Sequence, residues 1–184
     1  KDINEKEAFV YTNYWGINQH IVKILKNRFG NNLILDNSQA FYAKPLENID
    51  SFYSARKFFG VADGAYLYCQ KKLNEEIIQD ESYARMNHLL KRVDLSAQKG
   101  YSDFKTNDDS LINQPIKLMS KLTKAILVNI DYGKVAEIRR NNFEFLHEKL
   151  KDLNELKFEL DNESVPMVYP FLVKREGLKQ KLID

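Results

Sequence analysis

The sequence predicts an α/β protein, a three-layer αβα arrangement around a mostly parallel sheet. Three short apolar runs, at residues 8–12, 32–36 and 65–69, have the β-branched, leucine and aromatic residues of buried strands. Between the first two runs, apolar residues recur at helical spacing up to Gly30 and Asn31, a typical helix stop. A strand, a helix and a strand in about thirty residues form a βαβ unit, which requires parallel strands.

The chain becomes helical after the third apolar run. Amphipathic patterns predict helical structure over residues 74–101, 114–130 with Pro115 in the first turn, and 131–153. Residues 157–161 and 165–173 are typical of two strands in a separate small layer. We therefore expect the C-terminal half of a large domain over residues 1–128 and the start of a small α+β C-terminal domain over residues 129–184.

Composition narrows the classes of function. The chain has 184 residues and a net charge of +2, without a basic block, so no nucleic-acid partner is expected. Its single cysteine, Cys69, reads as a small buried hydrophobe and permits no internal disulfide. The three histidines lack ligand spacing, so no metal site is expected. No apolar run has the length of a membrane span, and a cytoplasmic protein without membrane contact is expected.

A lysine and an aspartate are the candidates for chemistry. Lys57 lies in residues 49–64, which read as a loop with aromatic residues that would exclude water. Such a lysine can react with a carbonyl group, although most lysines beside aromatics only pack their stems. Asp36 ends an apolar strand, where a carboxylate either pairs with a partner or caps the next turn. Pyridoxal phosphate needs such a lysine, an acidic partner for its ring nitrogen and small phosphate donors, which Ser51 or Ser54 could supply.

Two stretches carry a family resemblance. "LILDNSQAFY" and "SFYSARKFFGVADGAYL" resemble the core of fold-type I pyridoxal-phosphate enzymes, most closely the DegT–StrS group of sugar aminotransferases. In that group a strand aspartate is followed three positions on by Gln or His against the cofactor ring; Asp36 and Gln39 match this pattern. The resemblance makes Lys57 the cofactor lysine and Ser54 or Ser51 the phosphate serine.

The resemblance implies an activity and a setting. It implies transfer of an amino group from a donor such as glutamate to a keto acceptor of the nucleotide-linked keto-sugar class, through a Lys57 aldimine. Tyr14 and Asn13, at the end of the first strand, are candidates for substrate contact. Enzymes of this fold form homodimers. Family members are about twice as long as this chain, which we expect to be a piece lacking the N-terminal part of the large domain.

Three alternatives stay open. The same fold also performs other pyridoxal-phosphate reactions, such as dehydration and aldol-type cleavage. A non-catalytic relative would keep the fold as a binding or regulatory module. An α/β domain without any cofactor would leave Lys57 in water and Asp36 as a turn cap.

Overall fold

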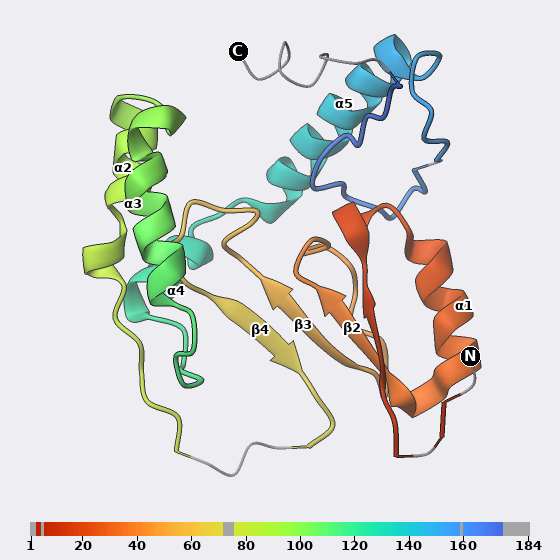
Figure 1. Ribbon diagram of the computed structural model, residues 1–184, viewed down its shortest axis with the longest axis horizontal. Helices are drawn as coiled ribbons and strands as arrows, with labels where there is room; N and C mark the ends of the chain where they lie inside the picture. The colour runs from red at the N-terminus through yellow and green to blue at the C-terminus, as the bar shows by residue number, and fades with distance from the viewer. Residues whose placement is uncertain (1–2, 5, 72–75, 159, 175–184) are drawn as a thin grey trace.

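The computed structural model describes residues 3–4, 6–71, 76–158 and 160–174. It is a mixed α/β structure with an open four-stranded sheet (Figure 1). The strands are β1 (Phe9–Thr12), β2 (Leu33–Asn37), β3 (Asp50–Ser54) and β4 (Ala65–Tyr68), and the α-helices are α1 (Gln19–Phe29), α2 (Asn87–Asp94), α3 (Ala97–Ser110), α4 (Lys121–Val128) and α5 (Tyr132–Leu150). Short 3-10 helices are η1 (Tyr14–Gly16), η2 (Gly30–Asn32) and η3 (Tyr83–Arg85).

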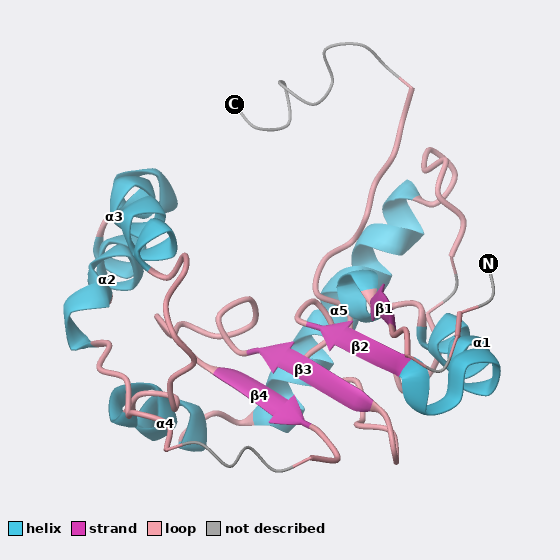
Figure 2. Cartoon of the chain, turned by 60° about the horizontal axis from the view of Figure 1, so that its bottom comes forward, coloured by secondary structure: helices cyan, strands magenta, loops and turns pink. Residues whose placement is uncertain are grey.

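The sheet order is β1-β2-β3-β4, and the first three strands are parallel. The predicted βαβ unit is confirmed, because α1 connects β1 to the parallel strand β2. β4 runs antiparallel to β3, so the chain turns back at the carboxyl end of β3. Figure 2 shows α1 beside β1 and β2 at one end of the sheet.

The prediction of a loop over residues 49–64 was wrong in its first part, because residues 50–54 form β3. Ser51 and Tyr53 are buried, whereas Phe52 between them is exposed. This alternation is that of a strand with one buried face. Because the inward position 51 holds a serine and not an aliphatic residue, residues 50–54 lack the apolar run that predicts a buried strand.

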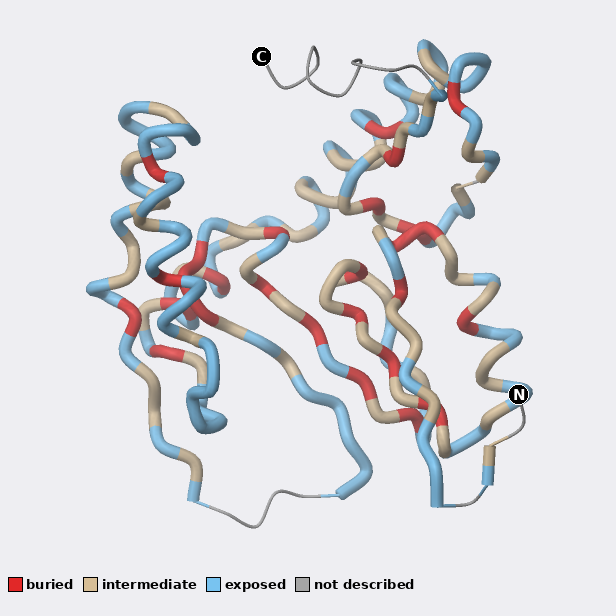
Figure 3. The backbone as a smooth tube through the Cα atoms, in the orientation of Figure 1, coloured by how far each residue is buried: buried red, intermediate tan, exposed pale blue. Residues whose placement is uncertain are grey.

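The two faces of the sheet differ. Leu33 and Leu35 of β2 form the main buried cluster with Val22 of α1 and Ile49. The other face exposes apolar side chains among the described residues: Val10 is 58% exposed, Phe52 37% and Leu67 54%. Figure 3 shows buried positions alternating along β2 and β3, with further buried positions in the connection that follows β3. The described residues therefore form a mixed α/β structure of the predicted class, and they bury one face of the sheet more fully than the other.

The helical segment predicted over residues 74–101 was right only in part: in the described residues the first α-helix, α2, begins at Asn87, and α3 continues to Ser110. These two helices form a hairpin that projects away from the sheet (Figure 1). The chain turns at Leu95, and Ser96 caps α3 by accepting a hydrogen bond from the Lys99 backbone N–H at 3.3 Å. Gly100 allows the two helices to approach closely, since a Cβ there would lie 2.7 Å from the carbonyl oxygen of His88. The hairpin is mostly exposed (Figure 3).

The helix predicted over residues 114–130 begins only at Lys121, so placing Pro115 in its first turn was wrong. Ser120 is the N-cap, and its hydroxyl accepts a hydrogen bond from the Thr123 backbone N–H at 3.1 Å. The helix predicted over residues 131–153 is confirmed as α5, which Asp131 caps. The division into domains at residue 128 stays a prediction.

The two strands predicted over residues 157–161 and 165–173 do not form in the described residues, which omit residue 159. Pro166 and Pro170 interrupt the second segment and cannot donate to a strand ladder. Side chains bind its backbone instead: the Asn154 amide donates to the Pro170 carbonyl at 2.8 Å and accepts from the Leu172 N–H at 3.0 Å. Among the described helices, none combines the length and apolarity needed to cross a membrane.

Candidate functional site

The carboxyl ends of β1, β2 and β3 meet at one edge of the sheet, where α/β proteins bind ligands. Asp36, near the end of β2, is half-buried at this edge. Its carboxylate accepts hydrogen bonds from the Thr12 hydroxyl at 3.3 Å and from the Ser38 backbone N–H at 2.9 Å. Within the described residues no cationic side chain bonds to this carboxylate, so it can accept a further donor.

Lys57 lies at the same edge, in the connection from β3 to β4. Its side chain is exposed, and Nζ donates a hydrogen bond to the Ser38 hydroxyl at 3.3 Å. Ser38 therefore links the lysine and the aspartate, through its hydroxyl to Lys57 and through its N–H to Asp36. Sequence reasoning missed Ser38. The available signal was its place two residues after a strand-ending aspartate, the position of an Asx turn.

The connection that carries Lys57 is anchored on both sides of the lysine. The Ala55 N–H donates to the Gly64 carbonyl at 3.0 Å, which closes the connection at its base. Ala55 and Phe58 are buried, and the Phe59 N–H donates to the Ala55 carbonyl at 2.9 Å. The backbone at Lys57 is thus held by buried neighbours while its side chain stays accessible.

Asp63 anchors the far end of the connection. It is only 6% exposed, and its carboxylate accepts hydrogen bonds from the Ser120 N–H and hydroxyl, both at 2.8 Å, and from the Thr123 hydroxyl. The Ser120 hydroxyl also lies 2.7 Å from that of Ser82. Burial raises the pKa of Asp63, but the hydrogen bonds from Ser120 and Thr123 outweigh burial and hold the pKa below its ordinary value.

A pocket of about 630 Å³ opens beside Lys57, between its connection and the α2–α3 hairpin. Four cationic side chains and one carboxylate line it: Arg56, Lys57, Arg92, Arg139 and Asp108. Arg56 pairs with Asp108 at 3.0 Å, and Arg139 donates to backbone carbonyls. Within the described residues Arg92 forms no ion pair, so the pocket presents uncompensated positive charge.

Other groups give this pocket an apolar wall. Tyr101 and Phe104 of α3 line it, with ring centroids 6.3 Å apart. The ring of His88 lies at 5.8 Å from that of Phe104, edge to face. Burial lowers the pKa of His88, and the nearby charge of Arg56 lowers it further, so His88 is neutral near pH 7. Positive charge beside aromatic surface suits an anionic ligand with a flat ring.

Three further residues predicted for the site lie near this edge. Ser54 ends β3, lies on the same sheet face as Asp36 and lines the pocket with Lys57. Gln39 is half-buried, and its side chain forms no hydrogen bond within the described residues. Tyr14 is 51% exposed just beyond β1, with its ring centroid 5.9 Å from that of Trp15.

Two predicted residues have completely buried side chains. Ser51 is completely buried inside β3, on the face opposite to Asp36 and Ser54. Asn13 is also completely buried; its amide donates to the Asn37 side chain at 3.0 Å and joins the ends of β1 and β2. Neither residue lines the Lys57 pocket, although Asn13 lies at the same sheet edge as Asp36, whose backbone carbonyl accepts a hydrogen bond from the Asn13 N–H at 2.9 Å.

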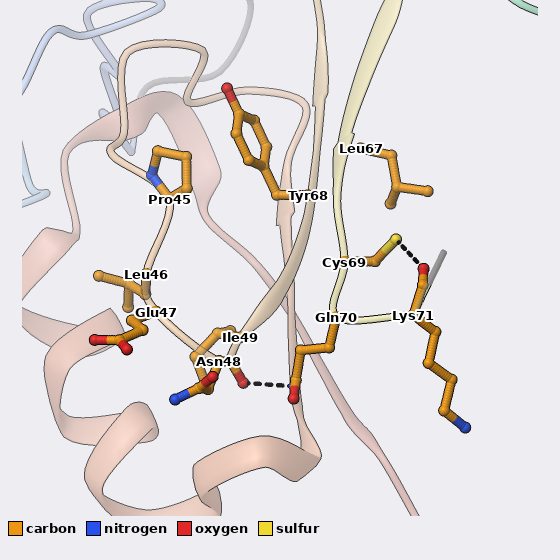
Figure 4. A pocket seen from close by; sticks show the side chains of 10 residues that line it. All are labelled: Pro45, Leu46, Glu47, Asn48, Ile49, Leu67, Tyr68, Cys69, Gln70 and Lys71. Carbon is orange, nitrogen blue, oxygen red and sulfur yellow. Dashed lines mark hydrogen bonds between the residues drawn. The ribbon is translucent and has the colours of Figure 1, made fainter. Parts of the chain in front are cut away.

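A second hollow, of about 780 Å³, lies at the amino end of β3, away from Lys57 (Figure 4). Residues 45–49 and 67–71 line it, and the Gln70 amide donates to the Asn48 carbonyl at 2.9 Å. Cys69 is exposed there, so the prediction that it is buried was wrong: β4 lies at an edge of the described sheet, and little covers its end. None of the predicted site residues lines this hollow.

Within the described residues, no three His, Cys, Asp or Glu side chains gather in a group that could hold a metal ion. Comparison with protein-family models, with curated proteins and with solved structures found no match to this chain.

Proposed function

We propose that this protein is a pyridoxal-phosphate-dependent aminotransferase with a fold-type I large domain, as its resemblance to the DegT–StrS group implies. The observation that carries the proposal is the contact of Lys57 Nζ with the Ser38 hydroxyl at 3.3 Å, at the sheet edge that holds the Asp36 carboxylate. A lysine and a carboxylate at one edge are the two groups that pyridoxal phosphate requires from a protein of this kind.

The residues present fit the cofactor. Lys57 has an accessible amine, and the Asp36 carboxylate has no cationic partner in the described chain. Ser54 lines the same pocket as Lys57 and would donate to the phosphate. Gln39 is free to pack on the ring or to bond its 3-oxygen. Asn13 and Ser51 are assigned no contact with the cofactor or the substrate, because their side chains are completely buried.

Bound pyridoxal phosphate supplies an electron sink for a carbanion at the carbon that loses its proton. The Asp36 carboxylate would keep a proton on the ring nitrogen, which makes the ring electron-accepting. The Lys57 amine would take a proton from the α-carbon of the amino donor, as general base, and deliver it as general acid to C4′, the carbon of the cofactor that carries the donor nitrogen. Phe58 and Phe59 next to it would limit the access of water.

The cationic pocket supports the acceptor class that the resemblance implies. A nucleotide-linked keto-sugar carries a negatively charged diphosphate, which Arg92 and Arg56 could bind, and a base, which could stack on Tyr101. Glutamate is the proposed amino donor. A homodimer and a cytoplasmic setting complete the proposal.

The first test is a visible absorption spectrum of the protein with added pyridoxal phosphate. Wild type should form a yellow adduct that borohydride reduces, and mass spectrometry should locate the reduced adduct on Lys57. Lys57→Ala should form none, whereas Lys23→Ala, which removes an exposed lysine of α1, should behave as wild type. An equal yellow band in Lys57→Ala would contradict the proposal.

A binding module without catalysis is the second candidate, because the cationic pocket needs no reaction at Lys57 to hold an anion. Glutamate distinguishes the two. An aminotransferase converts the yellow form with glutamate and releases 2-oxoglutarate, whereas a binding module leaves the band unchanged and releases none.

A further inference from the structure

We propose that Arg139 of α5 is a positioning residue that sets the place of Lys57; this inference rests on the proposed function. Arg139 does not belong to the lysine connection and was not among the predicted site residues. It reaches that connection from a helix more than eighty residues later in the chain, through contacts to the residue that follows Lys57.

The contacts of Arg139 converge on Phe58. Nη2 donates to the Phe58 carbonyl at 3.3 Å, and the guanidinium carbon lies 4.7 Å from the centre of the Phe58 ring. Nη1 donates to the Met167 carbonyl at 3.0 Å. One planar group thus joins α5, the C-terminal segment and the lysine connection. A planar fork with fixed donors holds two carbonyls at a set separation, which a lysine could not do.

The position of Phe58 makes these contacts relevant to Lys57. Phe58 is buried, and its ring packs on those of Phe41 and Tyr42 at centroid distances of 5.7 and 6.0 Å. Fixing the backbone and the ring of Phe58 restricts the backbone at Lys57, from which the amine must reach the reacting carbon. Within the described residues the hydrogen bonds of Arg139 go to Phe58 and Met167 and none goes to the Lys57 amine, so we assign its effect to Phe58.

Burial supports the assignment. Arg139 is half-buried, burial lowers its pKa from the ordinary value, and no carboxylate pairs with it in the described chain. A half-buried cation is costly unless its donors are used. Here the donors go to backbone carbonyls of two separate segments, which are the groups that hold the lysine connection against α5.

The chain offers a matched control in the next residue. Arg140 is also half-buried and also donates to carbonyls of the C-terminal segment, those of Asn162 at 3.1 Å and Ser164 at 2.5 Å. Within the described part of the chain its hydrogen bonds go to residues 161–164 and none goes to the lysine connection. Arg140→Gln therefore removes the same type of bond from the same helix, while it leaves Phe58 held.

The first measurement needs no cofactor. Wild type, Arg139→Gln and Arg140→Gln would be labelled with a trace of acetic anhydride, and mass spectrometry would give the labelling of Lys57 relative to Lys23. In Arg139→Gln the Lys57 amine should lose its hydrogen bond to Ser38 and become more exposed to water. Its rate of acetylation should rise about threefold, which corresponds to the loss of one ordinary hydrogen bond. Arg140→Gln should equal wild type.

The second measurement is the rate of adduct formation with pyridoxal phosphate, together with the visible circular dichroism of the adduct. Arg139→Gln should slow formation about tenfold and reduce the ellipticity per unit absorbance, because a displaced lysine holds the ring at another angle. Arg139→Lys should lie between wild type and Arg139→Gln, and serves as the working variant if Arg139→Gln unfolds. Thermal melting would confirm that the compared variants are folded.

The outcomes separate the two proposals. Equal labelling and equal dichroism in Arg139→Gln and Arg140→Gln would overturn the positioning role, even if wild type forms its adduct. A wild type that forms no adduct, with Lys57 labelling still specific to Arg139→Gln, would overturn the proposed function and support the control of Lys57 by Arg139.

Discussion

Asp36 and Asp63 are two aspartates at opposite ends of the segment that forms the site, and they are bonded in different ways. Asp63 is buried and accepts three hydrogen bonds, from Ser120 and Thr123. Asp36 is half-buried and accepts two, neither from a cation. A carboxylate whose oxygens are saturated by the fold serves stability, whereas one with remaining capacity can bind a ligand. The difference separates a structural acid from a candidate functional one.

Removing each carboxylate should show the largest contrast. Asp63→Ala should destabilise the protein by about 3 kcal/mol, because buried donors of Ser120 and Thr123 lose their acceptor. Asp36→Ala should cost less than about 1 kcal/mol, since its donors are nearer to water. Urea unfolding followed by circular dichroism measures both. Equal losses of stability would remove the distinction between the two acids.

Gly64, next to Asp63, should show a smaller effect of the same origin. Its φ is +113°, and a Cβ there would lie 3.0 Å from the Thr123 methyl group. Gly64→Ala should therefore destabilise by about 1–2 kcal/mol through strain and displacement of Thr123. Gly60→Ala is the control, because a Cβ at Gly60 meets no atom within 4 Å. A fully tolerated Gly64→Ala would show that the Asp63 cluster adapts freely.

The pH dependence of stability should follow Asp63. Because hydrogen bonds from Ser120 and Thr123 hold its pKa below the ordinary value of 3.8 despite burial, ionised Asp63 stabilises the fold above that value. This contribution is lost as the pH falls from 3.8 through the lower folded pKa. As the pH is lowered from 6, the free energy of unfolding should fall less steeply in Asp63→Asn than in wild type. An equally steep fall in the two proteins would assign the acid sensitivity to other groups.

Ser38 should show the smallest effect on stability. Ser38→Ala removes the hydroxyl that bonds Lys57 but keeps the N–H that bonds Asp36, so unfolding free energy should change by less than about 0.5 kcal/mol. The labelling of Lys57 by acetic anhydride should nevertheless rise. Unchanged labelling would mean that the hydroxyl does not restrain the amine.

The sequence alone predicted β1, α1, β2, β4 and α5. Residues 8–12, 32–36 and 65–69 lie in or around β1, β2 and β4, because aliphatic and aromatic runs mark buried strands. β3 was not predicted, because the inward-facing position 51 is a serine and breaks the apolar pattern. The prediction of two C-terminal strands was wrong, because apolar content does not indicate whether a partner strand exists. Prolines in the second segment also lack the N–H that a strand needs for ladder hydrogen bonds.

The candidate site was predictable in its residue types and less so in their orientation. Asp36 and Lys57 lie at one edge, linked through Ser38. Which of Ser51 and Ser54 shares that edge depends on strand register, since successive side chains point to opposite faces. Because the sequence did not predict β3, it could not show which of the two serines points to the same sheet face as Asp36. The sequence also could not predict the proposed role of Arg139, because that role depends on a contact with Phe58, which is far from Arg139 in the sequence.

The reversal of chain direction between β3 and β4 allows the length of the connecting segment to vary without a change in the sheet. Because Ala55 and Gly64 bond to each other, the segment between them begins and ends at one place on the sheet. Insertions or deletions within it would alter how far Lys57 reaches without shifting the pairing of Ser54 with Ala65. The reach of Lys57 can therefore change with the length of this segment while the pairing of β3 and β4 stays the same.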